Sequence, residues 1–341
     1  MNDNRLPHTL VDQLQRPLQD LRISVTDRCN FRCTYCMPRA VFGKDYDFLP
    51  RPEILTFEEI TRTARIFSKL GIKKIRLTGG EPLLRKNLEQ LIEQLSAIQP
   101  IEVALTTNAS ILAKKAQALK NAGLNRITVS LDALDDPTFK LMSDADFSVK
   151  DVLEGIEQAL HVGFEDIKVN CVIKRGTNDH ALLDLVRYFK GTAVTVRFIE
   201  FMDVGSTNNW QPVEVVPAKE MKDTINKEFP LESLEESYLG EVARRYRYAD
   251  GSGEIGFITS VTQPFCRQCT RIRLSTDGKL YTCLFANQGS DIRQLLRNQV
   301  SDAEITQHII TLWQSRNDRY SELRQIESGQ KKKIEMSYIG G

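Results

Sequence analysis

Three cysteines stand close together near the N-terminus, in the stretch CNFRCTYC. Cys29, Cys33 and Cys36 are an odd number of thiols, and their spacing is not typical of a disulfide framework. Three thiolates can ligate zinc, but a closed structural zinc site needs four ligands, and no fourth cysteine or histidine lies nearby in the sequence. Three thiolates on a four-iron cluster leave one iron open to a small molecule. The spacing therefore favours an iron–sulfur cluster with an open coordination position.

A second cysteine group lies near the C-terminus, in QPFCRQCTRIRLSTDGKLYTC. Cys266 and Cys269 form a CxxC pair, and Cys283 follows after thirteen residues. A zinc ribbon usually has two CxxC pairs, and here the second pair is missing. The count fits a second iron–sulfur cluster with an open iron, and zinc is the alternative. Cys171 stands alone in IKVNCVIK, and we interpret it as a small buried residue of a strand.

Basic residues accompany the second group. Arg271 and Arg273 follow the CxxC pair, and we expect them to share one face of a strand because strand side chains alternate. Paired guanidiniums suit phosphate, since each donates two parallel hydrogen bonds, whereas a surface pair that meets nearby acids is the alternative. The phosphate-loop pattern GxxxxGK[ST] is absent from the sequence. Basic residues of other strand-like segments could complete a triphosphate pocket: Arg22, Arg76, Lys168 and Arg197.

The elements that must position these residues repeat along the first part of the chain. Six apolar, β-branched runs predict strands, and amphipathic segments between them predict helices, such as the helix that opens with a Thr56–Glu59 capping box and closes at Gly71. Six β-then-α units predict a parallel sheet with right-handed crossovers. A closed barrel needs eight units, so the expected fold class is α/β, a partial TIM-type barrel that is open on one side. The predicted strands are 21–27, 73–80, 102–108, 125–133, 167–174 and 195–201, and the predicted helices are 56–71, 85–100, 113–123, 151–163 and 181–191.

The repeating pattern ends near residue 210. A helix-like stretch, short strand signals and two more helical stretches follow, and Asp277-Gly278 between two strand-like runs predicts a hairpin. We therefore divide the chain into a partial barrel, residues 1–210, and a C-terminal α+β extension, residues 211–341, that carries the second cysteine group with Arg271 and Arg273 and is expected to hold an auxiliary cluster and bind substrate. Functional residues are expected at the C-terminal ends of the barrel strands, and Cys29 lies directly after the first strand.

Two further features accompany the first cysteine group. Tyr35 lies between the second and third cysteines, where its ring can pack on a bound small molecule or cover the cluster. The second strand ends in TGGEP, Thr78 to Pro82, whose glycines let a ligand approach the backbone closely. Together, CxxxCxxC after a first strand and this glycine pair resemble the radical S-adenosylmethionine (SAM) superfamily. That resemblance implies that the open iron binds the amino and carboxylate groups of SAM.

A more specific resemblance rests on RISVTDRCNFRCTYCMP, IRLTGGEPLLR, SLDALD, RFIEFMDVG, the CxxCxRxR segment and the terminal Gly-Gly. From about residue 17 to the end, the chain resembles the GTP 3′,8-cyclase family, also called molybdenum cofactor biosynthesis protein A. The resemblance implies a radical SAM lyase with two [4Fe-4S] clusters. Its 5′-deoxyadenosyl radical abstracts the C3′ hydrogen of GTP, and the carbon radical attacks C8. The product is (8S)-3′,8-cyclo-7,8-dihydroguanosine 5′-triphosphate, the first intermediate of molybdenum cofactor (molybdopterin) biosynthesis.

The resemblance also implies roles for residues at matching positions. The ligands of the SAM cluster are Cys29, Cys33 and Cys36, and those of the auxiliary cluster, which binds guanine, are Cys266, Cys269 and Cys283. SAM contacts fall on Tyr35, Gly80, Ser130 and Met202. GTP contacts fall on Arg22, Arg76, Thr106, Lys168, Arg197, Arg271, Ile272 and Arg273. The catalytic residues are Arg271, Arg273, Gly340 and Gly341, of which the terminal glycines reach into the active site.

The sequence departs from the family pattern in two places. The third strand ends in TTNA, with Ala109 where the family has glycine, and a positive φ at this position would strain an alanine. The segment FKLMSDADF lacks an arginine that the family often carries near Ala145.

Composition limits the possible partners. Lys plus Arg is 46 and Asp plus Glu is 45, so the formal charge of +1 gives no global reason to expect nucleic-acid or membrane binding. No apolar run approaches the ~20 residues of a membrane span, and the N-terminal residues lack the apolar core of a signal peptide. We therefore expect a cytoplasmic protein with reduced thiols. The near-zero net charge allows a homodimer without requiring one.

The family resemblance implies two further partners, an external one-electron reductant and the downstream cyclic pyranopterin monophosphate synthase. Two alternative functions stay open at this point. One is another radical SAM enzyme with an auxiliary cluster, such as a peptide maturase, although these usually carry more cysteines. The other is a zinc-stabilised binding protein on a barrel scaffold, which metal content would distinguish.

Overall fold

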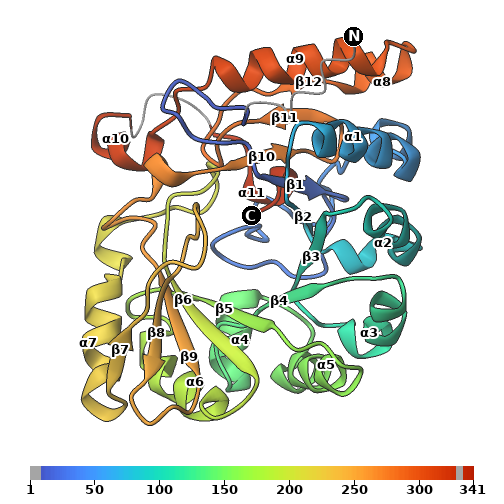
Figure 1. Cartoon of the computed structure of the whole chain (residues 1–341). Helices are drawn as coiled ribbons and strands as arrows, with labels where there is room; N and C mark the ends of the chain where they lie inside the picture. Colours follow the sequence, from blue (N-terminus) through green and yellow to red (C-terminus); the bar gives the residue numbers. More distant parts are fainter. Residues whose placement is uncertain (1–8, 328–332) are drawn as a thin grey trace.

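The structure is a computed structural model that describes residues 9–327 and 333–341. Six parallel strands in sequence order form its centre, and helices cover their outer side (Figure 1). All six predicted strands and all five predicted helices of this part are present, so the predicted order is confirmed. The strands are β1 (Asp20–Ser24), β2 (Lys74–Thr78), β3 (Glu102–Thr107), β4 (Arg126–Ser130), β5 (Ile167–Ile173) and β6 (Val194–Glu200); the helices are α1 (Phe57–Lys69), α2 (Leu88–Ser96), α3 (Leu112–Asn121), α5 (Val149–His161) and α6 (Leu182–Phe189).

The C-terminal extension supplies further strands and helices. The expected helices near 217–229, 291–298 and 302–316 and the expected hairpin are present. The elements are α7 (Ala218–Glu228), β7 (Leu231–Ser233), β8 (Arg244–Tyr248), β9 (Glu254–Ile258), β10 (Arg271–Leu274), β11 (Lys279–Tyr281), β12 (Ser290–Asp291), α8 (Arg293–Arg297), α9 (Asp302–Gln314), α10 (Tyr320–Glu327) and α11 (Met336–Ile339).

This extension lengthens the central sheet at both edges. Strand β10 pairs parallel with β1, and β9 pairs parallel with β6. The resulting twelve-stranded order is β12-β11-β10-β1-β2-β3-β4-β5-β6-β9-β8-β7. Since β12 and β7 end the order without pairing to each other, the sheet is open, as the fold class requires. The change of pattern near residue 210 thus separates two stretches of sequence that share one sheet.

Local sequence signals explain several element boundaries. Helix α1 begins at a capping box, in which Thr56 N donates to Glu59 Oε2 at 2.7 Å and Glu59 N donates to Thr56 Oγ1 at 3.2 Å. The sequence reading did not include α4 (Asp136–Ser143), although Asp135 caps its first turn by accepting from Thr138 N at 2.8 Å. Strands β7 and β8 were also not predicted. They are short, and in β8 a run of charged and aromatic residues hides the alternation of a strand.

A single large core lies between the sheet and its helices. The inward side chains of the parallel strands are almost fully buried, and Cys171 of β5 is among them with 0% exposure, as predicted. No helix within residues 9–327 and 333–341 is both long and apolar enough to cross a bilayer.

Candidate active site

The first cysteine loop follows the C-terminal end of β1. Main-chain hydrogen bonds from Cys36 N and Met37 N to the Cys33 carbonyl, at 3.0 and 2.9 Å, turn the loop so that Cys29, Cys33 and Cys36 line one cavity of about 330 Å³. Burial raises the pKa of Cys29 to about 12, and burial also raises the pKa of Cys36. Buried thiolates need nearby positive charge, and the iron ions of a cluster would supply it. The donor set therefore fits the expected cluster.

The TGGEP segment after β2 fastens this loop to the neighbouring strand ends. Gly80 N donates to Thr26 O at 2.8 Å, and a Cβ on Gly80 would overlap with the Arg28 carbonyl. Glu81 is 1% exposed, and its carboxylate accepts from Asn108 N, just after β3, at 2.7 Å. Burial raises the pKa of Glu81 to about 7. Only glycine can occupy position 80 without moving the cysteine loop.

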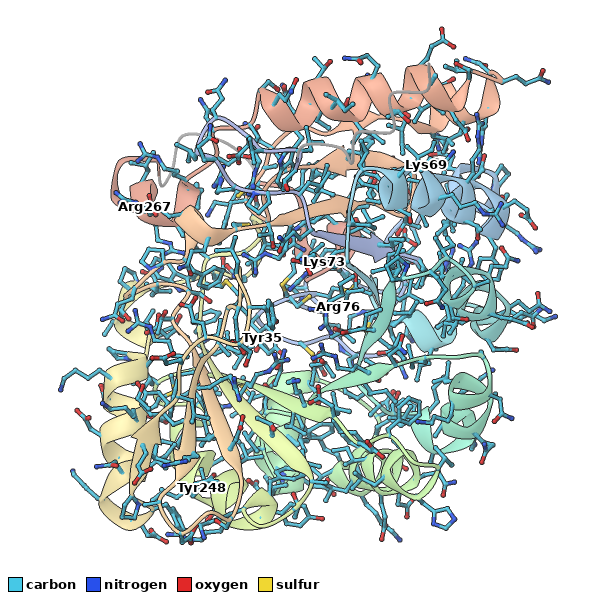
Figure 2. All side chains as sticks on the ribbon, viewed as in Figure 1. Tyr35, Lys69, Lys73, Arg76, Tyr248 and Arg267 are labelled. Carbon is cyan, nitrogen blue, oxygen red and sulfur yellow. The ribbon has the colours of Figure 1, made fainter. Side chains whose placement is uncertain are left out.

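Tyr35 is held on the β4 side of the same cavity. Its hydroxyl donates to Asp132 Oδ2 at 2.8 Å, and its ring packs with Met142 and Phe201 in a small apolar cluster. The ring lies in the middle of the molecule (Figure 2). An adenine placed against it would meet a fixed surface. The other candidate SAM contacts also line this cavity: Gly80, Ser130 and Met202.

The second cysteine group reaches the cavity from the extension. Cys266 and Cys269 precede β10, Cys283 follows β11, and the antiparallel β10–β11 hairpin brings Cys283 back so that all three line the cavity. Burial opposes ionisation of Cys269, but the charges of Arg271 and Arg316 outweigh it and lower its pKa to about 6. Both guanidiniums donate to Cys269 Sγ at 3.2 Å. A thiolate is thus favoured at Cys269, whereas burial raises the pKa of Cys283 to about 12.

Neither trio is arranged around a single ion. Within the part of the chain that the structure describes, no three His, Cys, Asp or Glu side chains converge closely enough to hold one metal ion. The zinc alternative gains no geometric support from this arrangement.

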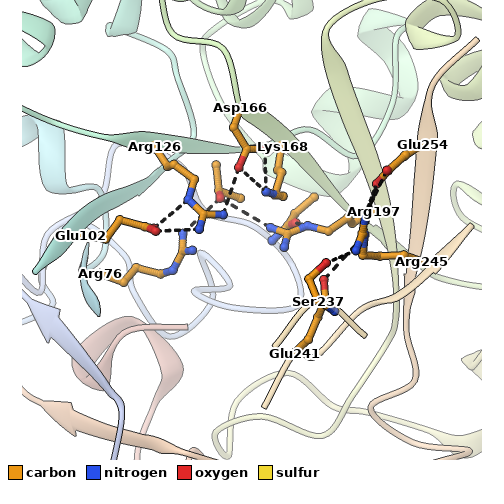
Figure 3. A network of polar contacts seen from close by, with 12 residues as sticks. Arg76, Glu102, Arg126, Asp166, Lys168, Arg197, Ser237, Glu241, Arg245 and Glu254 are labelled. Atoms are coloured by element: carbon orange, nitrogen blue, oxygen red, sulfur yellow. Dashed lines mark hydrogen bonds and ion pairs between the residues drawn. The ribbon is translucent and has the colours of Figure 1, made fainter. Parts of the chain in front are cut away.

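The sheet register aligns three arginines from adjacent strands. Arg22 of β1 lies opposite Arg273 of β10 on one side and Arg76 of β2 on the other, so their side chains share one face. Arg76 donates to Thr106 Oγ1 at 3.1 Å, and Arg197 reaches in from β6 (Figure 3). Among the described residues, no carboxylate forms an ion pair with these arginines. The cavity wall is therefore strongly basic.

Burial and mutual repulsion perturb these guanidiniums. Burial lowers the pKa of Arg22, and the charges of Arg273, Arg271 and Arg76 lower it further. Burial and, to a smaller extent, the charge of Arg271 lower the pKa of Arg273 to about 10. Burial and, to a smaller extent, the charge of Arg76 lower the pKa of Arg197 to about 10. A polyanion in the cavity would relieve this repulsion, whereas a cation would increase it.

The structure does not bring every candidate residue to the cavity wall. Lys168 Nζ pairs with Asp166 at 2.6 Å (Figure 3), and Lys168 does not line the cavity. Ile272 is fully buried in the core beside Leu21 and does not line the cavity. The candidates that do line the cavity are the six cysteines, Tyr35, Gly80, Ser130, Met202, Arg22, Arg76, Thr106, Arg197, Arg271, Arg273 and Gly341.

The C-terminal tail enters the centre of the molecule beside β1 (Figure 1). Arg273 Nη1 donates to the Gly340 carbonyl, and Gly341 lines the cavity. Gly340 has a φ of 76°, and a Cβ there would overlap with Thr78 Oγ1. Both the backbone conformation and the space therefore require glycine.

The FMDVG segment after β6 holds this tail in place. Asp203 accepts from Arg324 Nε at 2.7 Å and from Lys333 Nζ at 2.6 Å. Glu335 accepts from Ser206 N at 3.0 Å. These bonds fix the segment that leads to the terminal glycines.

Several cavity residues were missed from the sequence. Lys74 lies two residues before Arg76 on β2, so strand alternation could have identified it; its Nζ is 4.6 Å from the ring centre of Tyr238, in the loop between β7 and β8. Arg16 and Arg316 also line the cavity. They come from the two ends of the chain, and no sequence signal links them to the cysteines.

The conformation of Ala109 shows why glycine is favoured at this position. Its φ is 61°, in the left-handed region that favours glycine, so the condition for strain is met. Its neighbour Asn108 lies at the cavity, with Nδ2 3.9 Å from Cys29 Sγ.

Comparisons with known proteins first define a class. Residues 23–189 match the radical SAM superfamily. The fold is similar to that of Streptococcus suis SuiB bound to S-adenosylmethionine, with a TM-score of 0.63, 14% identity, and coverage of 94% of this chain and 76% of that chain. The open β/α sheet with a cysteine loop after β1 is thus that of the radical SAM enzymes.

The sequence comparisons narrow this class to a family. Residues 194–322 match the family Molybdenum Cofactor Synthesis C. A protein of Staphylococcus epidermidis named GTP 3′,8-cyclase is 50% identical over 98% of this chain and 100% of its own length. One of Acidothermus cellulolyticus with the same name is 49% identical over 97% of this chain and 98% of its own length. The chain belongs to the GTP 3′,8-cyclase family.

Proposed function

We propose that the chain is a radical SAM lyase that converts GTP into (8S)-3′,8-cyclo-7,8-dihydroguanosine 5′-triphosphate, the first step of molybdenum cofactor biosynthesis. The observation that carries the proposal is the row Arg273, Arg22 and Arg76 in the cavity that both cysteine trios line; among the described residues no carboxylate forms an ion pair with these arginines. A nucleoside triphosphate carries the charge that this wall needs. Family membership supports the same substrate.

The cysteine trios are proposed to hold two [4Fe-4S] clusters: Cys29, Cys33 and Cys36 one, and Cys266, Cys269 and Cys283 the other. When bound, the first cluster would supply the electron that breaks the C5′–S bond of SAM into methionine and a 5′-deoxyadenosyl radical, and this radical would take the C3′ hydrogen of GTP to give 5′-deoxyadenosine. Tyr35 packs against the adenine, and Gly80 lets SAM approach the backbone. Ser130 and Met202 complete the contacts with SAM.

The arginines are proposed to position GTP. Arg22, Arg76 and Arg197 neutralise the triphosphate from β1, β2 and β6, while Arg271 and Arg273 hold the nucleotide beside the auxiliary cluster. Gly340 and Gly341 close the cavity next to the reacting ribose. The remaining proposed GTP contacts are Thr106, Lys168 and the main chain of Ile272. Lys168 would first have to leave its ion pair with Asp166.

The proposal includes partners and setting. An external one-electron reductant supplies electrons, and cyclic pyranopterin monophosphate synthase consumes the product. The protein works in the cytoplasm without nucleic acid or membrane, and a homodimer is compatible with it. Residues 1–210 act as the radical-generating unit, and residues 211–341 act as the auxiliary-cluster and substrate-binding unit.

The test is an anaerobic reaction of the reconstituted protein with SAM, GTP and a strong reductant, followed by mass spectrometry. The expected result is 5′-deoxyadenosine that depends on GTP, together with a new compound of GTP mass. Deoxyadenosine without a GTP product would support the assignment to the radical SAM class and contradict GTP as the substrate. No SAM cleavage by protein that holds both clusters would contradict the proposal.

A further inference from the structure

Arg316 lies beside the second cysteine trio and has no role in the proposed binding of GTP. It follows α9, and its side chain is 1% exposed. Its Nη2 donates to Cys269 Sγ at 3.2 Å, and its Nη1 donates to the Cys269 carbonyl at 2.8 Å. The guanidinium thus binds both the sulfur and the main chain of one ligand residue.

Arg16 approaches the same trio from the segment before β1. Its side chain is also 1% exposed and lines the cavity. Its Nη1 donates to the Cys266 carbonyl at 2.8 Å, and its Nε donates to Asp12 Oδ2 at 2.6 Å. Its Nη2 is buried and, among the described residues, has no hydrogen-bond partner.

The charges around this site do not cancel. Asp12 pairs with both arginines, at 2.6 Å to Arg16 and 3.3 Å to Arg316, and Asp318 lies 3.4 Å from Arg316 Nε. Arg271 adds a third guanidinium at Cys269. Asp20 acts on Arg271, and Arg273 acts on Cys269. Four guanidiniums thus face three carboxylates, so the surroundings keep a positive charge. A buried, unpaired guanidinium nitrogen is costly, and an acceptor on the cavity side would satisfy it.

Sulfur atoms of an iron–sulfur cluster are such acceptors. Hydrogen bonds to those sulfurs and nearby charge are established determinants of a cluster's reduction potential. Adding an electron makes a cluster more negative, so buried donors and positive charge stabilise the reduced state more than the oxidised state.

We propose that Arg16 and Arg316 are positioning residues of the auxiliary cluster, an inference that rests on the proposed function. They fix Cys266 and Cys269 through their main-chain carbonyls. They also donate hydrogen bonds to the sulfur atoms of the cluster, and by doing so they raise its reduction potential.

The test is a potentiometric titration followed by electron paramagnetic resonance. The background is the full-length triple variant Cys29→Ala/Cys33→Ala/Cys36→Ala, in which only the auxiliary cluster gives a signal. Arg16→Gln or Arg316→Gln is then introduced into this background. Each glutamine is expected to shift the midpoint potential to a more negative value. A tenfold loss in the relative stability of the reduced state corresponds to about 59 mV for one electron.

Arg267→Gln is the matched control. Arg267 lies between Cys266 and Cys269 in sequence, but its side chain is 82% exposed and lies at the edge of the molecule (Figure 2). Its replacement removes one guanidinium charge next to the cluster ligands in sequence without removing a buried donor. The midpoint potential is expected to stay at the wild-type value.

Unchanged potentials in Arg16→Gln and Arg316→Gln samples with full iron content would overturn the inference. If a glutamine variant loses iron or does not fold, Arg316→Lys decides, because it keeps the charge but cannot bind both Cys269 Sγ and the carbonyl. An intermediate potential supports the inference, and a wild-type potential overturns it. If the wild-type protein takes up no auxiliary cluster, the proposed function is refuted. If the wild type forms the cyclised product but the midpoint potentials of the arginine variants do not change, only this inference is refuted.

Discussion

The two cysteine trios open into one cavity but have opposite electrostatic surroundings. Beyond burial, Glu81 raises the pKa of Cys29, and Glu335 adds to the rise at Cys36. At Cys269, in contrast, neighbouring guanidiniums lower the pKa to about 6 in spite of burial. We call the end beside Glu81 and Glu335 the acidic end, and the end formed by Arg271, Arg316 and the row Arg273, Arg22 and Arg76 the basic end.

This difference separates the two proposed ligands. SAM carries a positive sulfonium and an amino group, so the acidic end suits it. GTP carries a triphosphate, so the basic end suits it. If each end selects by charge, a change at one end should impair one ligand and leave the other unaffected.

The largest expected effect comes from the first trio. Cys29→Ala should abolish deoxyadenosine formation because the cluster that reduces SAM loses a ligand, while iron at the second trio is retained. The mirror variant, Cys269→Ala, should keep the iron of the first trio, form no cyclised GTP and lose the stimulation of SAM cleavage by GTP. Iron analysis and quantification of deoxyadenosine check both. If Cys29→Ala formed deoxyadenosine at the wild-type rate, the assignment of SAM cleavage to the first trio would be wrong.

Arginine variants should give the next largest effect. Arg271→Ala and Arg273→Ala each remove a charge-assisted contact, worth roughly 1.5–3 kcal/mol, which corresponds to a rise of about 10- to 150-fold in the GTP dissociation constant. Anaerobic calorimetry measures this constant, and SAM affinity should not change.

Arg187→Ala serves as the control, because Arg187 is half exposed and pairs with Glu228 away from the cavity. An unchanged GTP dissociation constant in both Arg271→Ala and Arg273→Ala would remove these residues from the binding site. A parallel loss of SAM affinity would show that the two ends are not independent.

The tail lies between the two ends, and its loss should affect turnover more than binding. Gly340→Ala would place a methyl group against Thr78, so the tail should shift and kcat should fall about tenfold, or about 1.4 kcal/mol. Deleting Gly340 and Gly341 should act in the same direction with both clusters intact. Steady-state kinetics with iron analysis tests this.

A second substitution makes the steric argument specific. Thr78→Ala removes Oγ1, the atom that the new methyl group would overlap, so the double variant Gly340→Ala/Thr78→Ala should recover part of the lost rate. Full activity of the truncated protein would show that the tail is dispensable.

The acidic end was more predictable from sequence than the basic end. Cys29 and Tyr35 are neighbours in one loop, and TGGEP ends the next strand, so local spacing indicated them. The six strands were predictable because each is an apolar run with a helix after it. These signals depend on residues that are close in sequence.

The basic end depends on register and on distant pairings. Arg22 and Arg273 are neighbours because β10 pairs parallel with β1, and no local pattern shows that the extension joins the sheet there. Arg16 and Arg316 read as ordinary surface charges in a polar N-terminal segment and after a helix. Their burial follows only from the packing of that segment on α9, where Trp313 Nε1 donates to the Arg16 carbonyl at 3.2 Å.

The smallest expected effect concerns stability at the acidic end. Ala109 has a φ of 61°, which costs an L-residue about 1–2 kcal/mol. Ala109→Gly should remove this strain, but the greater freedom of glycine in the unfolded chain offsets about 0.4–1 kcal/mol. The net gain should therefore lie between about 0 and 1.6 kcal/mol, visible as a higher urea midpoint with an unchanged m-value.

Ala116→Gly is the matched control for this change. Ala116 is also buried, but it lies within α3, where glycine should destabilise by about 1 kcal/mol. If Ala109→Gly raises the free energy of unfolding and Ala116→Gly lowers it, the backbone strain lies at position 109. Equal destabilisation would mean that the Ala109 methyl group contributes more through packing than its conformation costs, and the left-handed position would then be tolerated for the sake of the core around α3 and α5.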